Sequence, residues 1–347
     1  MKVAIIGGTG AFGRALAMRL RLLGEDVFVG SRDEQRGRER AIELGVQGGT
    51  NEDVVRGADL VVLATKSNAA LETARSLAEA IGVTPVLCVA SDLAFTDAGV
   101  LPGRAERSLA EELADIVRAP VASGLQSLSA IHLSDPEPPD QDALICGDDP
   151  VAKKLALDLA GRLVSGRALD VGPLANSRAL EAILRESVRL VRTRPPLVIA
   201  ETRHGFVCAS AGVDASNAPE AETVVLLPED PDASAARLRD RLRELTGAEV
   251  GVIVSDSFGR AWRHGTTDVA IGAAGIEPLL DLGGQRDPVG YELHATVIAT
   301  ADELAGAAEL VMGKIAGVPA AIVRGVEVRG DGAARELVMP AERDLFR

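Results

Sequence analysis

A glycine-rich segment near the N-terminus has the residue types and spacing of a dinucleotide site. An apolar run, residues 3–6, is typical of a buried parallel strand, and a helical pattern follows from residue 14. Between them, a GxGxxG spacing lets the chain turn sharply at its first glycine, brings backbone amides close to a pyrophosphate, and opens a helix whose N–H groups attract phosphate. A purely structural glycine turn is the alternative. We predict that the cofactor-binding residues here are Gly8, Thr9, Gly10, Ala11, Phe12 and Gly13.

The second apolar strand ends at side chains that suit a 2′-phosphate. An NAD site would place a carboxylate there to hold the ribose hydroxyl, whereas this chain has Ser31 and Arg32, with Arg36 one helical turn later. A hydroxyl and planar guanidinium groups are good phosphate donors, so we predict NADP(H) binding by these three residues. Asp33 and Glu34 are the opposing observation, and we assign them to the first turn of the next helix.

Two further loops are candidates for the same pocket. Ligands of doubly wound sheets lie at the carboxyl ends of the strands. Residues 65–68 follow the third apolar strand, and residues 91–92 follow the fourth. Plain turn chemistry is the alternative for each of these residues, and the sequence leaves both interpretations open.

The glycine loop belongs to a larger set of motifs in the first half of the chain. They are residues 5–13, 30–32, 48–51, 146–150 and 171–178. Through them, residues 1–183 resemble the NADPH-dependent coenzyme F420 reductases, also called F420:NADP oxidoreductases. The resemblance implies an N-terminal Rossmann domain of residues 1–180, a doubly wound parallel sheet in an α/β fold. It also implies direct hydride transfer between NADP(H) and coenzyme F420 over residues 125–130, so we assign no catalytic residue.

The second half carries two acidic loops. It begins with a basic run, residues 184–194, whose spacing predicts a helix that ends at Pro195. Further on, Asp214 and Asp256 each follow a short apolar strand. Carboxylates suit hard cations such as Mg²⁺ and Mn²⁺, which take their remaining ligands from phosphate oxygens. The alternative is that both aspartates cap turns or helices, and the residues alone leave the two interpretations open.

A short basic segment comes directly after the second acidic loop. It contains Arg260, Arg263 and His264, whose side chains could bind a phosphate or a substrate carboxylate. The net charge of the whole chain, −14, does not oppose this interpretation, because a small anion needs only a local positive site. A solvated basic loop is the alternative.

The acidic loops also belong to a set of motifs, residues 201–209, 211–217, 226–232, 254–260 and 267–272. Through them, residues 181–347 resemble the C-terminal two-thirds of coenzyme F420-0:gamma-glutamyl ligase, an α+β domain. The resemblance implies GTP and Mg²⁺ or Mn²⁺, which activate a terminal carboxyl as an acyl phosphate for attack by the amine of L-glutamate. By position, it implies that Asp214, Asp256 and Ser257 bind metal and that Asn217 contacts the nucleotide.

Composition sets the outer limits of the function. A length of 347 residues suggests two domains, and 47% apolar with only 2% aromatic residues predicts cores of Ala, Val, Leu and Ile. The net charge argues against a nucleic-acid partner. The sequence shows neither an apolar run of about 18 residues nor a signal-peptide pattern, so we expect no membrane partner. The three widely spaced cysteines read as small buried side chains of a cytoplasmic protein.

Both resemblances lead to one coenzyme. We therefore predict a multifunctional enzyme of F420 metabolism, in which NADP(H)-dependent hydride transfer to or from F420 or its precursor is joined to a GTP- and metal-dependent F420-0:L-glutamate ligase. One alternative is a ligase with a regulatory NADP-binding domain. Another is a non-catalytic F420-binding module. Both families also imply a homodimer.

Overall fold

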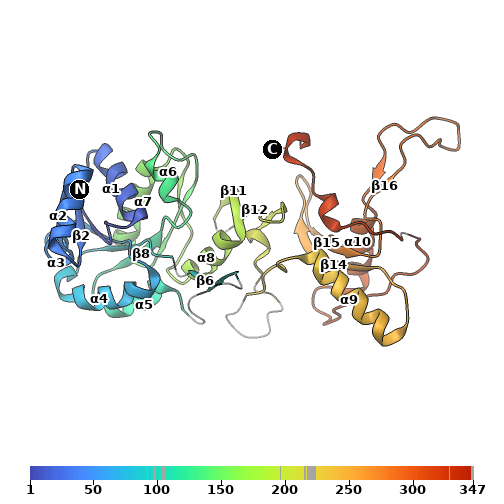
Figure 1. The fold of residues 1–347 in the computed structure, drawn as a ribbon, viewed down its shortest axis with the longest axis horizontal. Helices are drawn as coiled ribbons and strands as arrows, with labels where there is room; N and C mark the ends of the chain where they lie inside the picture. Colours follow the sequence, from blue (N-terminus) through green and yellow to red (C-terminus); the bar gives the residue numbers. More distant parts are fainter. Residues whose placement is uncertain are drawn as a thin grey trace. The chain divides into compact units, whose positions relative to one another are not determined.

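The chain forms two compact units (Figure 1). The computed structural model describes residues 1–91, 93–96, 99–102, 107–195, 197–214, 216, 224–327 and 329–344. Unit 1 comprises Met1–Ala200 with Ala215–Val224, and unit 2 comprises Glu201–Asp214 with Val225–Arg347.

Unit 1 is built on an eight-stranded sheet in the order β10-β9-β8-β5-β4-β1-β2-β3. The strands from β8 to β3 in that order are parallel, which confirms the Rossmann prediction. In contrast to the predicted all-parallel sheet, β9 runs antiparallel to β8, and β10 follows the direction of β9. The strands are β1 (Lys2–Ile6), β2 (Asp26–Ser31), β3 (Gln47–Thr50), β4 (Leu60–Leu63), β5 (Val86–Cys88), β8 (Val121–Gly124), β9 (Ala143–Gly147) and β10 (Ala168–Asp170).

The reversal at the edge of the sheet has a simple cause. Two neighbouring strands can be parallel only if the chain crosses back to the end of the sheet where the first strand began, usually through a helix of several turns. Between β8 and β9 the chain forms only the short helix α6 (Ala130–Ser134). The chain therefore begins β9 at the end of the sheet where β8 finished, and the two strands pair antiparallel.

Helices cover both faces of the sheet (Figure 1). Because strand side chains alternate between the faces, Val3 and Ile5 pack with α1, α2, α6 and α7, whereas Ala4 and Ile6 pack with α3, α4 and α5. The cores are mainly aliphatic, and all three cysteines of the chain are buried, as predicted. The helices are α1 (Ala11–Leu22), α2 (Glu34–Leu44), α3 (Asn51–Val55), α4 (Ser67–Ile81), α5 (Leu109–Ile116) and α7 (Pro150–Leu163).

The remaining elements of unit 1 lead towards unit 2 along the chain. A hairpin, β6 (Leu93–Thr96) and β7 (Gly99–Pro102), precedes α5. Helix α8 (Asn176–Glu186) is followed by β11 (Ser187–Arg194), so the prediction of a helix over residues 184–194 was wrong. Pairing of β11 with β12 (Leu197–Thr202) prevails over the helical spacing there.

Unit 2 is organised around a long antiparallel hairpin (Figure 1). Strand β14 (Val252–Gly259) pairs with β15 (Thr266–Ala274), with a bulge between Val254 and Ser255. Helices α9 (Pro231–Thr246) and α10 (Thr300–Met312) pack against β15. The shorter elements are β13 (Val207–Ala209), η1 (Ser210–Gly212), β16 (Leu280–Asp281), β17 (Val297–Ile298), η2 (Ala334–Leu337) and η3 (Ala341–Arg343). None of the described helices is both long and apolar enough to span a membrane.

The glycine at the end of β1 tests how tightly unit 1 is built. Gly7 has φ +80° and a Cβ there would lie 2.7 Å from the Ala64 carbonyl oxygen, whereas Gly24 has φ +81° and open space around it. We expect Gly24→Ala to cost about 1 kcal/mol of left-handed strain. Gly7→Ala should cost about 1–3 kcal/mol more, because backbone atoms must move. Urea unfolding followed by circular dichroism measures both, and equal losses would contradict the close contact.

Candidate functional site

The glycine loop is locked between β1, β2 and the chain that leaves β4. A Cβ at Gly8 would lie 2.7 Å from Val29 Cγ1, and one at Gly13 would lie 2.7 Å from the Gly7 oxygen. Gly10 is the N-cap of α1 and makes no side-chain capping bond, and both it and Ala11 are exposed. The loop is therefore tightly packed, and the first turn of α1 has backbone N–H groups without intrahelical partners, as an anion site requires.

The sharp turn falls one residue earlier than the sequence motif predicts. Gly7, not Gly8, has the positive φ. The reason is tertiary, because the Gly7 backbone passes so close to Ala64 that only a glycine fits there. Gly8 instead provides the close approach to β2, and Gly10 and Gly13 lie where the spacing predicts them, at the start of α1.

The end of β2 offers cationic groups to the same edge of the sheet. Ser31 is buried at this end, and its Oγ accepts a hydrogen bond from the Asp33 backbone. Asp33 caps α2 by accepting from the Arg36 backbone N–H at 2.8 Å, as its assignment to the helix start predicted. Within the described part of the chain, the exposed guanidinium groups of Arg32 and Arg36 have no hydrogen-bond or ion-pair partner.

Two buried polar atoms near the carboxyl ends of the parallel strands make no hydrogen bond. Asn51 Oδ1 and Thr65 Oγ1 have no hydrogen-bond partner, although both atoms are buried. Thr65 follows β4 and lies in a loop that the sequence predicted as part of the pocket, whereas Asn51 was given no role. Buried polar atoms of this kind cost free energy unless a ligand or water satisfies them. Of the other predicted loop, Ser91 is described and Asp92 lies outside the described residues.

The segment after β8, over which the sequence predicts hydride transfer between NADP(H) and coenzyme F420, has a strained backbone. Leu125 is fully buried and has φ +68°, which is rare for a side chain of this size. Gln126 Nε2 donates to Ser123 Oγ at 3.0 Å and approaches the Cys88 carbonyl oxygen at 3.5 Å. These contacts fix the segment at the carboxyl ends of β5 and β8, the edge that also carries the glycine loop.

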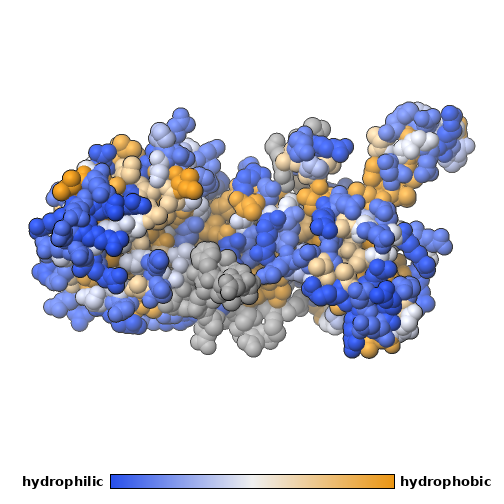
Figure 2. Space-filling model, viewed as in Figure 1, coloured by the Kyte–Doolittle hydropathy of each residue, from blue (hydrophilic) through white to orange (hydrophobic). Residues whose placement is uncertain are grey.

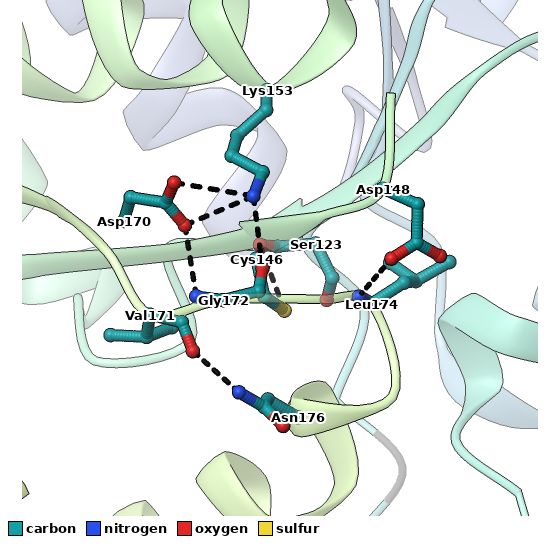
Figure 3. A network of polar contacts seen from close by, with 9 residues as sticks. All are labelled: Ser123, Cys146, Asp148, Lys153, Asp170, Val171, Gly172, Leu174 and Asn176. Atoms are coloured by element: carbon teal, nitrogen blue, oxygen red, sulfur yellow. Dashed lines mark hydrogen bonds and ion pairs between the residues drawn. The ribbon is translucent and has the colours of Figure 1, made fainter. Parts of the chain in front are cut away.

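A polar network holds the opposite edge of the sheet together (Figure 3). Lys153 Nζ lies 3.1 Å from Asp170 Oδ1 and donates to the Gly172 carbonyl oxygen at 3.2 Å. Asp148 accepts from the Leu174 backbone, and Asn176 donates to the Val171 carbonyl oxygen. Because β9 and β10 are reversed, their carboxyl ends lie beside the amino end of β8. The motifs at residues 146–150 and 171–178 therefore shape the fold and lie away from the glycine loop.

Unit 2 brings the two predicted metal-binding aspartates near each other. The Asp214 backbone exchanges two hydrogen bonds with Val225, at 3.0 and 2.7 Å, and Lys314 Nζ lies 3.3 Å from Asp214 Oδ2. Burial raises the pKa of Asp256, while the hydrogen bond from the Ser257 backbone and the charge of Lys314 oppose the rise. The charges of Asp214 and Asp268 raise the pKa of Asp256 further. The two carboxylates therefore act on each other electrostatically, and the positive charge of Lys314 partly offsets their negative charge.

Ser257 belongs to a separate group of polar side chains. Its hydroxyl donates to Asp268 Oδ1 at 2.7 Å, and Ser255 donates to Asp268 Oδ2 at 2.8 Å. Successive side chains of a strand point to opposite faces, so Asp256 lies on the other face of β14. The Asp268 backbone also donates to Glu309 on α10. The structure thus separates Ser257 from Asp256, although the sequence grouped them.

The donors of unit 2 fit a hard divalent cation. Asp214 and Asp256 supply carboxylate oxygens, and a cation of this kind takes the rest of its ligands from phosphate and water. Among the described residues, no three His, Cys, Asp or Glu side chains are arranged to hold a metal by themselves. Asn217, the predicted nucleotide contact, lies outside the described residues. Nothing in the sequence spacing pointed to Lys314, because α10 brings it to Asp214 only in the folded chain.

These features define a Rossmann unit with a glycine loop, joined along the chain to a unit with a pair of carboxylates. Sequence comparison adds the families. The model for "NADP oxidoreductase coenzyme F420-dependent" matches residues 2–87, and the model for "F420-0:Gamma-glutamyl ligase" matches residues 69–325. The chain belongs to the F420-0:gamma-glutamyl ligase family. The ligase match begins well before residue 181, where the sequence predicted the ligase-like half to start.

Known proteins resemble both halves. The coenzyme F420:L-glutamate ligase of Methanopyrus kandleri is 45% identical over 212 residues, which cover 57% of this chain and 84% of that protein. The ligase of Methanothermobacter thermautotrophicus is 46% identical over 189 residues, covering 53% and 75%. A crystal structure from Arthrobacter sp. FB24, described as a candidate F420-dependent NADP reductase, is 27% identical, with a TM-score of 0.47, and the match covers 52% of this chain and 89% of that one. The chain is thus a fusion of an F420-dependent NADP oxidoreductase domain and an F420-0:gamma-glutamyl ligase domain, as predicted.

The raised pKa of Asp256 gives a test of the carboxylate site. The Asp256 carboxyl binds its proton more tightly in the folded chain than in the unfolded chain. Above the raised pKa the ionised carboxylate therefore destabilises the fold. This destabilisation vanishes when the pH falls below the ordinary value of 3.8. We expect Asp256→Asn to raise the Tm at pH 7 in metal-free buffer and to give no gain at about pH 3.5. The exposed Asp281 provides the control, since Asp281→Asn should not reproduce this pH-dependent gain. A gain that is the same at both pH values would contradict the assignment.

Proposed function

We propose that the chain is a bifunctional enzyme that acts on coenzyme F420 through both of its domains. The observation that carries the proposal is the occurrence, on one chain, of two families defined by the same coenzyme. We assign the oxidoreductase to residues 1–180 and the ligase to residues 181–347, although the compact first unit extends to Ala200. Small molecules are then the substrates: NADP(H), F420 or F420-0, GTP and L-glutamate.

The oxidoreductase domain binds NADP(H) at the carboxyl edge of its parallel strands. The loop from Gly8 to Gly13 holds the pyrophosphate, and the first turn of α1 adds its N–H groups. Ser31, Arg32 and Arg36 hold the 2′-phosphate, which is supported by two exposed guanidinium groups at the end of β2. Hydride then passes directly to a deazaflavin ring, and the protein contributes by holding both rings in contact.

The test of this domain is NADPH oxidation with oxidised F420 as the acceptor. We expect Arg32→Ala to weaken NADPH about 10- to 100-fold and to leave NADH unchanged, because one charge-assisted phosphate contact is worth about 1.5–3 kcal/mol. Arg38→Ala is the matched control, since Arg38 lies nearby on α2 but forms an ion pair with Glu34. Equal losses for both cofactors would remove the 2′-phosphate role, and NADPH binding without oxidation would reduce the domain to a cofactor-binding module.

The ligase domain uses Asp214 and Asp256 to hold Mg²⁺ or Mn²⁺ beside the phosphates of GTP. The bound metal would neutralise charge on the transferring phosphoryl group while the terminal carboxyl of F420-0 is activated for attack by glutamate. Lys314 adds a positive charge at Asp214. Ser257 with Asp268 presents further hard oxygen donors on the other face of β14, and Asn217 follows Asp214 as a nucleotide contact.

The removal of one carboxylate tests this domain. We expect Asp214→Asn to lower glutamyl transfer to F420-0 at least about 100-fold and to weaken Mn²⁺ binding, because a neutral amide cannot replace a charged ligand. Mass spectrometry of the coenzyme product measures the first effect, and calorimetric titration with Mn²⁺ measures the second. Asp281→Asn is the control, because Asp281 is an exposed aspartate of the same unit that accepts a hydrogen bond from the Gly283 backbone. Unchanged transfer in Asp214→Asn would refute the metal role.

The enzyme is proposed to act as a homodimer. Large apolar side chains reach the surface of the molecule (Figure 2), and in unit 2 they include Leu238, Leu242 and Leu245 of α9 and Leu310 and Val311 of α10. Patches of exposed apolar residues are typical of surfaces that bind another protein. A second copy of the chain is the simplest partner that would cover them.

A further inference from the structure

One aromatic residue occupies an unusual place in unit 2. Trp262 is the single tryptophan of the chain, and it is 81% exposed in the loop between β14 and β15. Its φ is +58°, a left-handed conformation that costs a residue with a bulky side chain free energy. A chain with only 2% aromatic residues thus exposes most of its largest side chain, on a strained backbone. Strain of this kind is characteristic of positions that bind ligands.

The loop around Trp262 is basic. Arg260, Arg263 and His264 are all exposed, within a chain whose net charge is −14. The Arg263 backbone donates to the Arg260 carbonyl oxygen at 3.3 Å, and Arg260 Nη2 lies 3.5 Å from the His264 carbonyl oxygen. These contacts hold a tight loop that presents a flat ring beside positive charge. This combination suits a planar ligand with anionic groups.

The same hairpin connects this loop to the carboxylate site. Gly259 pairs with Thr266 at the last rung, and Ser257 pairs with Asp268 two rungs earlier. A strand rises about 3.3 Å per residue, so the base of the loop lies roughly 10 Å along β14 from Asp256. An elongated ligand can therefore place one end on the loop and the other at the aspartates.

We propose that Trp262 is the stacking platform for the deazaflavin ring of F420-0, and that Arg260, Arg263 and His264 bind the anionic part of the coenzyme. The terminal carboxyl of the coenzyme then reaches the Asp256 end of the hairpin, where the reaction takes place. This inference rests on the proposed ligase function. Trp262 acts in positioning and specificity, because it holds the substrate at the end that does not react.

Three variants at one position test the proposal. Trp262→Phe keeps a ring, Trp262→Ala removes it, and Trp262→Gly removes it while relieving the left-handed strain. We expect the alanine variant to raise KM for F420-0 roughly 10- to 100-fold, as for other aromatic side chains that stack on a base, with KM for GTP unchanged. Phenylalanine should rescue most of the loss. The glycine variant should bind F420-0 as poorly as alanine and yet have a higher Tm than the alanine variant. Tyr291→Ala, at a 62% exposed aromatic residue of the same unit, is the matched control and should change neither KM.

The fluorescence of the single tryptophan gives an independent readout. The rate constant for quenching of Trp262 by acrylamide should fall when F420-0 is added to the full chain. Suppose that equilibrium dialysis shows F420-0 binding and that glutamyl transfer proceeds. If F420-0 then leaves quenching in the wild-type chain unchanged and KM is unaffected in every Trp262 variant, the proposal is wrong and the ligase function stands. If Trp262 is already protected without ligand in proportion to protein concentration, it is a contact between copies of the chain, and the proposal is also wrong. If F420-0 does not bind to the wild-type chain at all, the ligase function itself fails.

Discussion

The close backbone contact between β1, the glycine loop and α1 is the constraint on which unit 1 depends. Gly7 passes the Ala64 carbonyl oxygen and Gly13 passes Gly7 at distances that leave no room for a Cβ. Because the three segments meet without side chains, α1 begins directly at the edge of the sheet. Its N–H groups therefore face the place where β1, β2 and β4 all end. The proposed anion site would thus be a consequence of packing, and the arginines after β2 would only select among anions that already fit.

Unit 2 depends instead on how it accommodates the buried carboxylate of Asp256. Burial disfavours the ionised form of Asp256, and Asp214 adds negative charge nearby. The opposing contributions come from one backbone N–H and from Lys314, which approaches from the end of α10. The proposed divalent cation would relieve the same repulsion more strongly, and its binding would then stabilise the folded chain. Asp268 also adds to this repulsion, although its own carboxylate accepts hydrogen bonds from Ser255 and Ser257.

The sequence predicted what depends on local order along the chain. The strand, glycine loop and helix of the proposed dinucleotide site are contiguous, so their spacing predicts their geometry. The capping role of Asp33 likewise follows from its neighbours in the sequence. The sequence could not predict features that arise between distant segments. The turn falls at Gly7 because of Ala64, and residues 187–194 form a strand because β12 pairs with them. Lys314 and Asp268 join their sites only through the packing of α10 and the register of the hairpin.

The two proposed reactions address opposite ends of one coenzyme, and this limits how they can be combined. Hydride transfer needs the deazaflavin ring against nicotinamide, whereas the inferred ligase complex stacks the same ring on Trp262. One coenzyme molecule therefore cannot serve both domains at the same time and must leave one before it reacts at the other. Fusion does not make the chemistry simultaneous. A released coenzyme is not tethered to the chain, so fusion gives it no effective concentration at the second site. What fusion does fix is an equal number of the two domains, because every chain carries one of each.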